Sequence, residues 1–145
     1  MIFRTAGIED LPELQRIEES CFQEERYPPE VLAEILLDGD FETILAEEDE
    51  LVGAATINCG EDLAAAQLAS IAVLPPHRGK GIGRALLDEA EGRARGRGRK
   101  IMVLQVNVHN VAAINLYLHR GYIIEGMIGD YYGPGRDAYF MDKML

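Results

Sequence analysis

The chain has 145 residues, of which 48% are hydrophobic and 27% are charged, as in a globular domain with a substantial core. No apolar run approaches the roughly 18 residues that cross a bilayer, and the first residues lead into a polar stretch without a signal-peptide core. Two cysteines are too few for a disulfide framework, and neither has a metal-ligand spacing with the three histidines. The sequence therefore predicts one cytoplasmic domain over residues 1–145, with no metal and no membrane contact.

The formal net charge of −11 is distributed unevenly along the chain. Residues 1–62 contain 18 acidic and three basic residues, whereas residues 63–145 contain 11 basic and seven acidic ones. Residues 78–100 alone carry eight basic residues against three acidic ones. A mostly negative protein repels nucleic acid and attracts cationic partners. The local basic segment therefore favours a site for a small polyanion, with a solvated surface of uneven charge as the alternative.

The first half of the chain predicts one strand, two helices and a hairpin. Residues 1–5 have strand character, and an apolar stripe at helical spacing follows, formed by Leu11, Leu14, Ile17 and Cys21. A break at residues 27–29 precedes a second, short helix over residues 31–36. Residues 41–46 and 51–58 are rich in β-formers on either side of an acidic turn, which indicates a hairpin.

Strands and helices alternate in the second half. An apolar strand at residues 67–74 ends at two prolines, and a glycine-rich turn leads into a helix from about residue 82 to residue 95. A strand at 101–106, a helix from near Asn110 to Gly121 and strands near 122–128 and 138–144 follow. The order β-α-α-β-β-β-α-β-α-β-β predicts an α/β (α+β) domain whose central mixed, mostly antiparallel sheet is flanked by helices.

The glycine-rich turn has the features of a pyrophosphate site. Glycines at positions 79, 81 and 83 let successive N–H groups converge, and the helix that begins there adds unpaired N–H groups and its positive dipole end. Arg78, Lys80 and Arg84 supply positive charge. A Walker A loop does not fit, because no Ser or Thr follows Lys80, and the glycines do not have the G-x-G-x-x-G spacing. A flexible surface turn is the alternative.

Three segments resemble signatures of one superfamily. Arg78-Gly79-Lys80-Gly81-Ile82-Gly83 resembles the acetyl-CoA signature [Q/R]-x-x-G-x-[G/A] of the GNAT acetyltransferases. Residues 106–117, with the Gly121-Tyr122 that follows, resemble the V-x-x-x-N-x-x-A-[I/L]-x-L-Y…G-[F/Y] segment of its N-terminal acetyltransferase branch, and residues 130–139 are similar to its Y-Y-x-x-G-x-D-A-Y end. That branch includes ribosomal-protein alanine and archaeal N-terminal acetyltransferases. The resemblance implies a single-domain GNAT fold and transfer from acetyl-CoA.

The resemblance also implies which residues bind the cosubstrate. Backbone groups of the strand before the turn would lie along the pantetheine arm, and the turn would hold the pyrophosphate. Tyr117 would lie near the thioester sulfur, where its phenol suits a donor to the leaving thiolate; packing on a helix face is the alternative reading. The implied set is Ile71, Ala72, Val73, Arg78, Gly79, Lys80, Gly81, Ile82, Gly83, Arg84, Asn110 and Tyr117.

A general base is harder to assign. Amide formation needs a neutral amine and an acceptor for its proton. Bacterial members of the branch carry a glutamate on the fifth strand, where this sequence has Gln105, and the second position used by some eukaryotic relatives is Gln67. Glutamine has no useful proton affinity, so Gln105 at most orients water. Glu24 and Glu25 remain as candidates, because the segment after them resembles the archaeal substrate loop; a solvated acidic surface is the alternative. The predicted catalytic residues are Tyr117, Glu25 and Gln105.

The weak base favours an acceptor that loses its proton easily. An α-amine has a pKa of about 7.7–8.0, against about 10.4 for lysine. We therefore expect the acceptor to be the N-terminus of a protein or peptide, held by Phe22, Glu24, Glu25, Tyr27, Tyr131, Tyr132 and Tyr139. A lysine or a small-molecule amine is the alternative, and a catalytically silent acyl-CoA-binding module is a further one. The arginines of residues 93–100 could bind RNA, but a cationic helix end that stops at Gly96 is the preferred interpretation.

Overall fold

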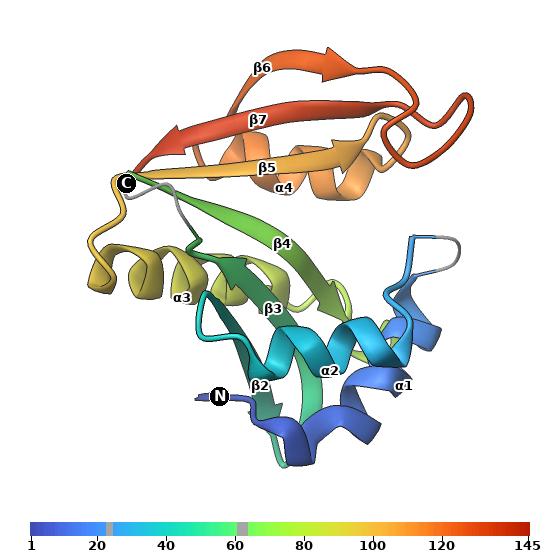
Figure 1. Cartoon of the computed structure of the whole chain (residues 1–145), viewed down its shortest axis with the longest axis vertical. Helices are drawn as coiled ribbons and strands as arrows, with labels where there is room; N and C mark the ends of the chain where they lie inside the picture. The colour runs from blue at the N-terminus through green and yellow to red at the C-terminus, as the bar shows by residue number, and fades with distance from the viewer. Residues whose placement is uncertain (23–24, 61–63) are drawn as a thin grey trace.

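The protein is built around one seven-stranded sheet, seen in a computed structural model that describes residues 1–22, 25–60 and 64–145 (Figure 1). The strands are β1 (Ile2–Thr5), β2 (Phe41–Glu48), β3 (Glu50–Asn58), β4 (Ala65–Val73), β5 (Ile101–Asn107), β6 (Ile123–Ile128) and β7 (Ala138–Met144). The helices are α1 (Leu11–Cys21), α2 (Pro29–Leu37), α3 (Ile82–Gly96) and α4 (Val111–His119). Every predicted element is present. Short 3₁₀ helices at Ile8–Asp10 and Pro75–His77 were not predicted.

The sheet has the order β1-β2-β3-β4-β5-β7-β6. All neighbours are antiparallel except β4 and β5, which confirms the mixed, mostly antiparallel sheet. The parallel pair is short, since only Ala65, Ala66 and Gln67 of β4 are paired with β5. Beyond Gln67 the two strands diverge, as Figure 1 shows. The remaining part of β4 therefore has no strand on its β5 side.

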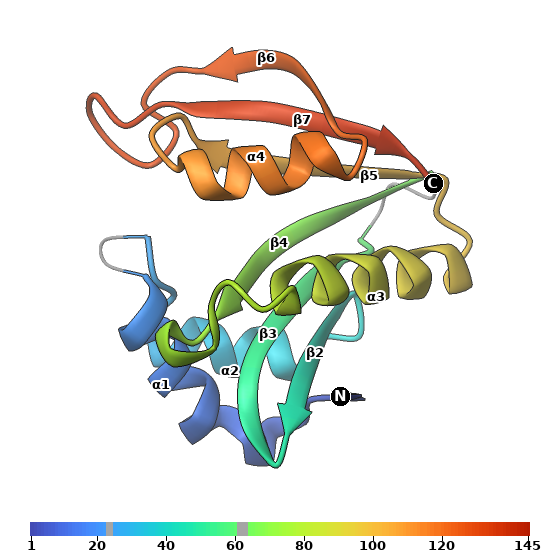
Figure 2. The ribbon, with the colours of Figure 1, turned by 180° about the vertical axis from the view of Figure 1, so that it is seen from behind.

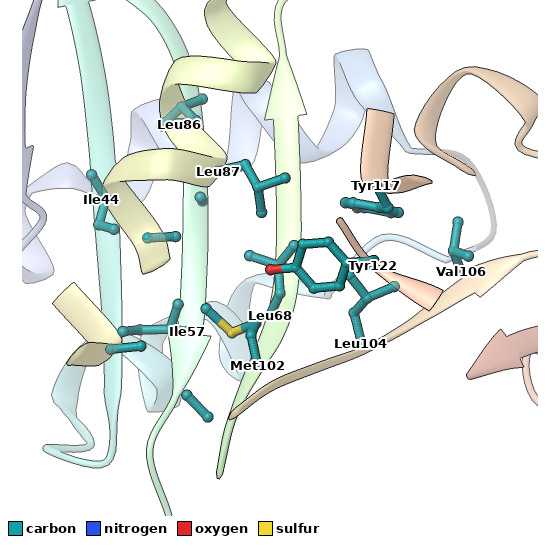
Figure 3. Packing of buried hydrophobic residues seen from close by; sticks show 14 of the residues in the cluster. Ile44, Ile57, Leu68, Leu86, Leu87, Met102, Leu104, Val106, Tyr117 and Tyr122 are labelled. Atoms are coloured by element: carbon teal, nitrogen blue, oxygen red, sulfur yellow. The ribbon is translucent and has the colours of Figure 1, made fainter. Parts of the chain in front are cut away.

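Helices cover both faces of the sheet. Helices α1 and α2 lie on one face, and α3 and α4 lie on the other (Figures 1 and 2). The larger core lies under α3 and α4, where Leu86, Leu87 and Tyr122 are almost completely buried (Figure 3). A smaller core under α1 and α2 contains Leu14 and Ile17. The apolar stripes read from the sequence are the faces that these helices bury.

A β-bulge in β4 changes which side chains face which core. Thr56 of β3 is paired with Ser70 and Ile57 with Leu68, so Ala69 is the extra residue. Leu68 packs in the larger core and Ala72 in the smaller one, although a regular strand would place residues four apart on the same face. The bulge lies close to the point where β4 leaves β5.

The end of α3 differs in detail from the expectation. Gly96 is the last helical residue, whereas the residue with positive φ is Gly98, at +79°. The N–H of Gly98 donates to Arg95 O and that of Arg99 to Ala94 O, which is the hydrogen-bond pattern of a Schellman motif. The helix therefore ends at Gly96 as predicted, but the residue in the left-handed region that closes this pattern is Gly98, two positions later.

The arginines near the end of α3 are bound within the chain. Arg93 donates to Glu42 at 2.7 Å and to Glu89 at 2.9 Å, and Arg97 donates to the carbonyl oxygen of Gly39 at 2.8 Å. These contacts fasten the helix end to the β1–β2 side of the sheet, in agreement with the interpretation as a cationic helix end. Among the helices of the described residues, none is long and apolar enough to cross a membrane.

Candidate active site

A cleft of about 370 Å³ opens where β4 and β5 diverge. Its walls come from both sides of the sheet opening, from α1 and α4, and from the chain around residues 25–27 and 131–132. The lining residues are Glu18, Phe22, Glu25, Tyr27, Gln67, Leu68, Ala69, Ser70, Ile71, Gln105, Val106, Asn107, Asn110, Ala113, Tyr117, Tyr131 and Tyr132. The cleft brings together residues from nearly the whole length of the chain.

One wall is the free edge of β4. Ile71 lines the cleft, and the backbone of β4 beyond Gln67 has no strand on this side. An extended molecule with amide groups could pair with such an edge as another strand would. Of the three residues predicted to bind pantetheine, Ile71 lines the cleft, whereas Ala72 packs in the smaller core and Val73 O accepts a hydrogen bond from Arg78 Nε.

The turn between β4 and α3 has the backbone conformation predicted for an anion site. Gly79 and Gly81 have φ values of +78° and +82°, and no atom lies within 4 Å of a Cβ placed on either one. These glycines are therefore required by conformation rather than by crowding. The first helical hydrogen bond runs from the Ala85 N–H to Gly81 O at 3.1 Å, so the amides that begin α3 have no carbonyl of the preceding turn to bind. Within the part of the chain that the structure describes, these amides are available to bind an anion.

The three basic residues of the turn differ in position. Lys80 and Arg84 are exposed at the helix start. Arg78 instead folds back, and its Nε donates to Val73 O at 2.9 Å. Arg78 also contacts the thiol of Cys21, whose pKa is raised by burial. Arg78 thus holds the end of β4 against α1, whereas Lys80 and Arg84 are placed to meet a solvent-borne phosphate.

Asn110 and Tyr117 line the cleft from α4. The Asn110 side chain caps the helix, because its Oδ1 accepts the Ala113 N–H at 3.2 Å. Tyr117 is 5% exposed and packs edge-on against Tyr122, with ring centroids 5.8 Å apart (Figure 3). Burial raises the pKa of Tyr117, and nearby Tyr132 adds to that effect. The phenol therefore keeps its proton, so it can act as a donor.

The two glutamines predicted to occupy base positions are in direct contact. Gln67 Nε2 donates to Gln105 Oε1 at 2.8 Å across the start of the β4–β5 opening. Neither amide takes up a proton near neutral pH, so this pair can orient a polar group but not act as a base. The geometry agrees with the limited role expected for Gln105.

Tyrosines form the wall opposite the β4 edge. Tyr131 and Tyr132 pack edge-on, with centroids 4.8 Å apart, and Tyr27 lines the same space. Burial raises the pKa of Tyr132 and that of Tyr27, so both phenols are neutral. Phe22 also lines the cleft, as expected.

Glu25 joins three segments across this end of the cleft. Its Oε1 accepts hydrogen bonds from Asn107 Nδ2 at 2.9 Å and from Arg136 Nη2 at 2.8 Å. The carboxylate thus ties the chain before α2 to the end of β5 and to the β6–β7 loop. Because its carboxylate is held by these two donors, Glu25 connects the three segments and is not well placed to accept a proton from the acceptor amine.

One of the predicted acceptor residues lies away from the cleft, and another lies outside the described residues. Tyr139 does not line the cleft: β7 pairs Tyr139 with Val106, and its ring packs against the larger core. The alternation of side chains along β7 puts Tyr139 on the same face as Met141, which packs in that core. Glu24 lies outside the described residues.

Sequence reasoning missed Glu18. It lies on α1, is only 7% exposed and lines the cleft. Its position four residues after Leu14 and one after Ile17 puts it on the buried face of the helix, so a carboxylate interrupts an otherwise apolar stripe. That interruption was the available signal.

Comparison with known protein families identifies the class of protein to which this fold and cleft belong. The model of the acetyltransferase (GNAT) family matches residues 10–122. The chain therefore belongs to the GNAT acetyltransferase family. The predicted fold and family are both confirmed.

Individual relatives are named for different acceptors. The chain is 39% identical over 77 residues to an N-alpha-acetyltransferase of Sulfurisphaera tokodaii and 33% identical over 79 residues to the L-amino acid N-acyltransferase MnaT of Escherichia coli. In each case the match covers 52% of this chain and 46% of the relative, so the chain spans about half the length of these curated relatives. The ribosomal-protein-S18-alanine N-acetyltransferase structure from Escherichia coli superposes with a TM-score of 0.88 at 26% identity, covering 99% of this chain and 93% of that one.

Proposed function

We propose that the protein transfers the acetyl group of acetyl-CoA to the α-amine of a protein or peptide N-terminus. The acetyl-CoA would lie along the β4 edge, with its pyrophosphate at the amides of residues 79–84. Lys80 and Arg84 would add charge, and Tyr117 would protonate the leaving thiolate. Amine attack on the acetyl carbonyl carbon forms the C–N bond and breaks the C–S bond.

The observation that carries the choice of acceptor is the charge of the cleft. Its described lining contains the two carboxylates Glu18 and Glu25 and no lysine or arginine. An amine approaching as a cation is attracted to such a site, whereas the carboxylate of a free amino acid is repelled. A peptide N-terminus offers the amine without a carboxylate beside it. The flat, partly polar faces of Tyr27, Tyr131 and Tyr132 suit a peptide backbone.

Two relatives support the same acceptor by name: an N-alpha-acetyltransferase and a ribosomal-protein alanine N-acetyltransferase. The second candidate function is acetylation of a small-molecule amine, because another relative is named an L-amino acid N-acyltransferase. A lysine side chain is the third possible acceptor, and its higher pKa makes the neutral amine about 250–500-fold rarer than for an α-amine.

The test uses one peptide sequence in two forms and one free amino acid. The first peptide has a free terminus and a dimethylated lysine, and the second has a blocked terminus and a free lysine. We expect acetylation of the first peptide only. Acetylation of the second alone would replace the proposal with lysine transfer, and acetylation of the free amino acid alone would replace it with the small-molecule function. Binding of acetyl-CoA without any transfer would identify a silent acyl-CoA-binding module.

A further inference from the structure

Glu18 is a buried carboxylate that contributes charge to the cleft but has no chemical step assigned to it in the proposed function. It projects from α1 between the acceptor cleft and a small internal cavity, about 20 Å³ in volume, beneath α1 and α2. A glutamate is rarely buried to this degree without a cation beside it. In the described part of the chain no lysine or arginine contacts the Glu18 carboxylate.

One backbone contact fixes the position of this side chain. Glu18 Oε2 accepts the Tyr27 N–H at 2.9 Å, which holds the chain before α2 against α1. The bond favours the charged carboxylate, but burial outweighs it and raises the pKa of Glu18. The result is an oriented carboxylate of increased basicity at the wall of the cleft.

The two carboxylates of the cleft differ in what they can do. Glu25 is held by Asn107 and by the cation of Arg136, both at its Oε1. Glu18 has a single neutral donor on its Oε2 and no ion pair among the described residues. A carboxylate without an opposing cation is the better proton acceptor.

We propose that the Glu18 carboxylate accepts the proton that the acceptor amine loses as it attacks the acetyl group. As the C–N bond forms and the C–S bond breaks, one proton passes from the amine nitrogen to Glu18, directly or through one water. A separate proton passes from Tyr117 to the coenzyme A thiolate, so charge and protons balance. The inference rests on the proposed function, and it explains how the site operates with the Gln67–Gln105 amide pair where a base is otherwise expected.

Several titratable groups near Glu18 stay neutral over the pH range in which Glu18 ionises. The titratable and charged groups that face it or share its cleft are Cys21 on α1, Tyr27 and Glu25 before α2, Arg78 beside Cys21, Tyr117 on α4, and Tyr131 and Tyr132 of the β6–β7 loop. Burial raises the pKa of the Cys21 thiol and the pKa of each of Tyr27, Tyr117 and Tyr132. These four groups therefore stay neutral while Glu18 ionises.

The inference predicts a steeper pH profile than the amine alone would give. Activity requires a neutral amine and an ionised Glu18. At low pH both groups are protonated, and each must lose a proton before the reaction can occur. The acidic limb of log kcat/KM should therefore be steeper than one power of ten per pH unit in the parent protein, and it should fall to that single slope in Glu18→Gln.

Glu18→Gln is a conservative test, because an amide oxygen can still accept the Tyr27 N–H. We expect kcat to fall about 10²–10⁴-fold, with acetyl-CoA affinity changed less than threefold. The matched control is Glu19→Gln, an exposed neighbour on α1, which should keep the parent profile. A Glu18→Gln protein that binds acetyl-CoA normally and keeps the parent kcat and slope would overturn the inference.

A second variant separates chemistry from folding. Glu18→Ala leaves a space in which added formate can act as the proton acceptor, so formate should restore part of the lost rate in proportion to its concentration. No restoration in a folded Glu18→Ala protein would contradict the inference. If the parent protein acetylates only the lysine peptide, the proposed acceptor is wrong, and the same Glu18 comparison is then made with that peptide.

Discussion

The two parts of the candidate site, the predicted cofactor end and the acceptor end, are built from the chain in opposite ways, and the turn and helix start of the cofactor end lie outside the residues that line the cleft. The cofactor end comes from one continuous segment, in which β4, the turn at residues 79–81 and the start of α3 follow each other directly. The acceptor end is assembled from α1, the chain at residues 25–27 and the β6–β7 loop, and the Glu25–Arg136 ion pair within it spans 111 positions. A continuous segment carries its conformation in local glycines and helix signals, whereas an assembled wall depends on how distant elements pack.

Charge follows the same division. The cofactor end has Lys80 and Arg84 exposed at a helix N-terminus, and the acceptor end has Glu18 and Glu25 in its lining. The proposed polyanionic cosubstrate and cationic acceptor would therefore be attracted to different parts of the candidate site. The reacting atoms would meet between them, near Tyr117.

The largest effect is expected at Tyr117, where the two ends meet. Tyr117→Phe removes only the phenolic proton, so kcat should fall about 10²–10⁴-fold while acetyl-CoA affinity changes little. Steady-state kinetics and calorimetry measure the two quantities. A loss in kcat of less than threefold would show that Tyr117 serves in packing alone.

The affinity for acetyl-CoA should fall when the glycine turn is forced out of the left-handed region. Gly81→Val places a branched side chain at a φ of +82°, where open space is available but the conformation is strained. Loss of two charge-assisted hydrogen bonds to a pyrophosphate, at about 1.5 kcal/mol each, would raise the Kd for acetyl-CoA about 100-fold.

Gly92→Val is the matched control for this turn. Gly92 is an exposed residue of the same helix, its Cβ would also meet open space, and its φ is not positive. Calorimetry should find its affinity for acetyl-CoA close to that of the parent. Equal affinities for both variants would mean that the turn conformation does not hold the cosubstrate.

A smaller effect is expected at the acceptor end. Glu25→Gln keeps an oxygen for Asn107 but removes the charge that pairs with Arg136. Partly exposed ion pairs contribute up to about 1 kcal/mol, so kcat/KM for a peptide should fall no more than about fivefold, with unchanged acetyl-CoA binding. Glu30→Gln, an exposed change in α2, is the control. A loss as large as that of Glu18→Gln would reverse the roles assigned to these two carboxylates.

The smallest effect concerns the anchoring of α1. Asp10 accepts two hydrogen bonds from Arg4 and one from the Gly7 N–H, and the bonds from Arg4, more than the opposing burial, keep its pKa below the usual range. Since the pKa is lower in the folded state, this contribution to stability is present at neutral pH and is lost as the pH falls through the folded-state pKa. Asp10→Asn should lower stability by about 1 kcal/mol at pH 7 and by less at pH 3, as measured by urea unfolding. An equal loss at both pH values would contradict the assignment.

Much of the fold could be predicted from the sequence, because the residue patterns that define its helices and turns are local. The apolar stripes of α1 and α3, the prolines after β4 and the glycines before α3 each act within a few residues. The sequence alone could not give the Ala69 bulge or the short β4–β5 pairing, because both depend on which strands become neighbours. Helix α3 ends at Gly96 as the sequence predicts, but the role of Gly98 in closing the turn depends on hydrogen bonds that the sequence does not show.

The sequence by itself determined the family, the order of strands and helices and the conformation of the glycine turn, because glycine conformation and helix N-termini are properties of a short segment. The tertiary structure decided the acceptor end. Only packing could turn Tyr139 towards the core, engage Glu25 with Arg136 and bury Glu18 at the cleft with no lysine or arginine of the described segments beside it. The basicity and availability of a carboxylate depend on its burial and its partners, and both are set by residues far away in the sequence.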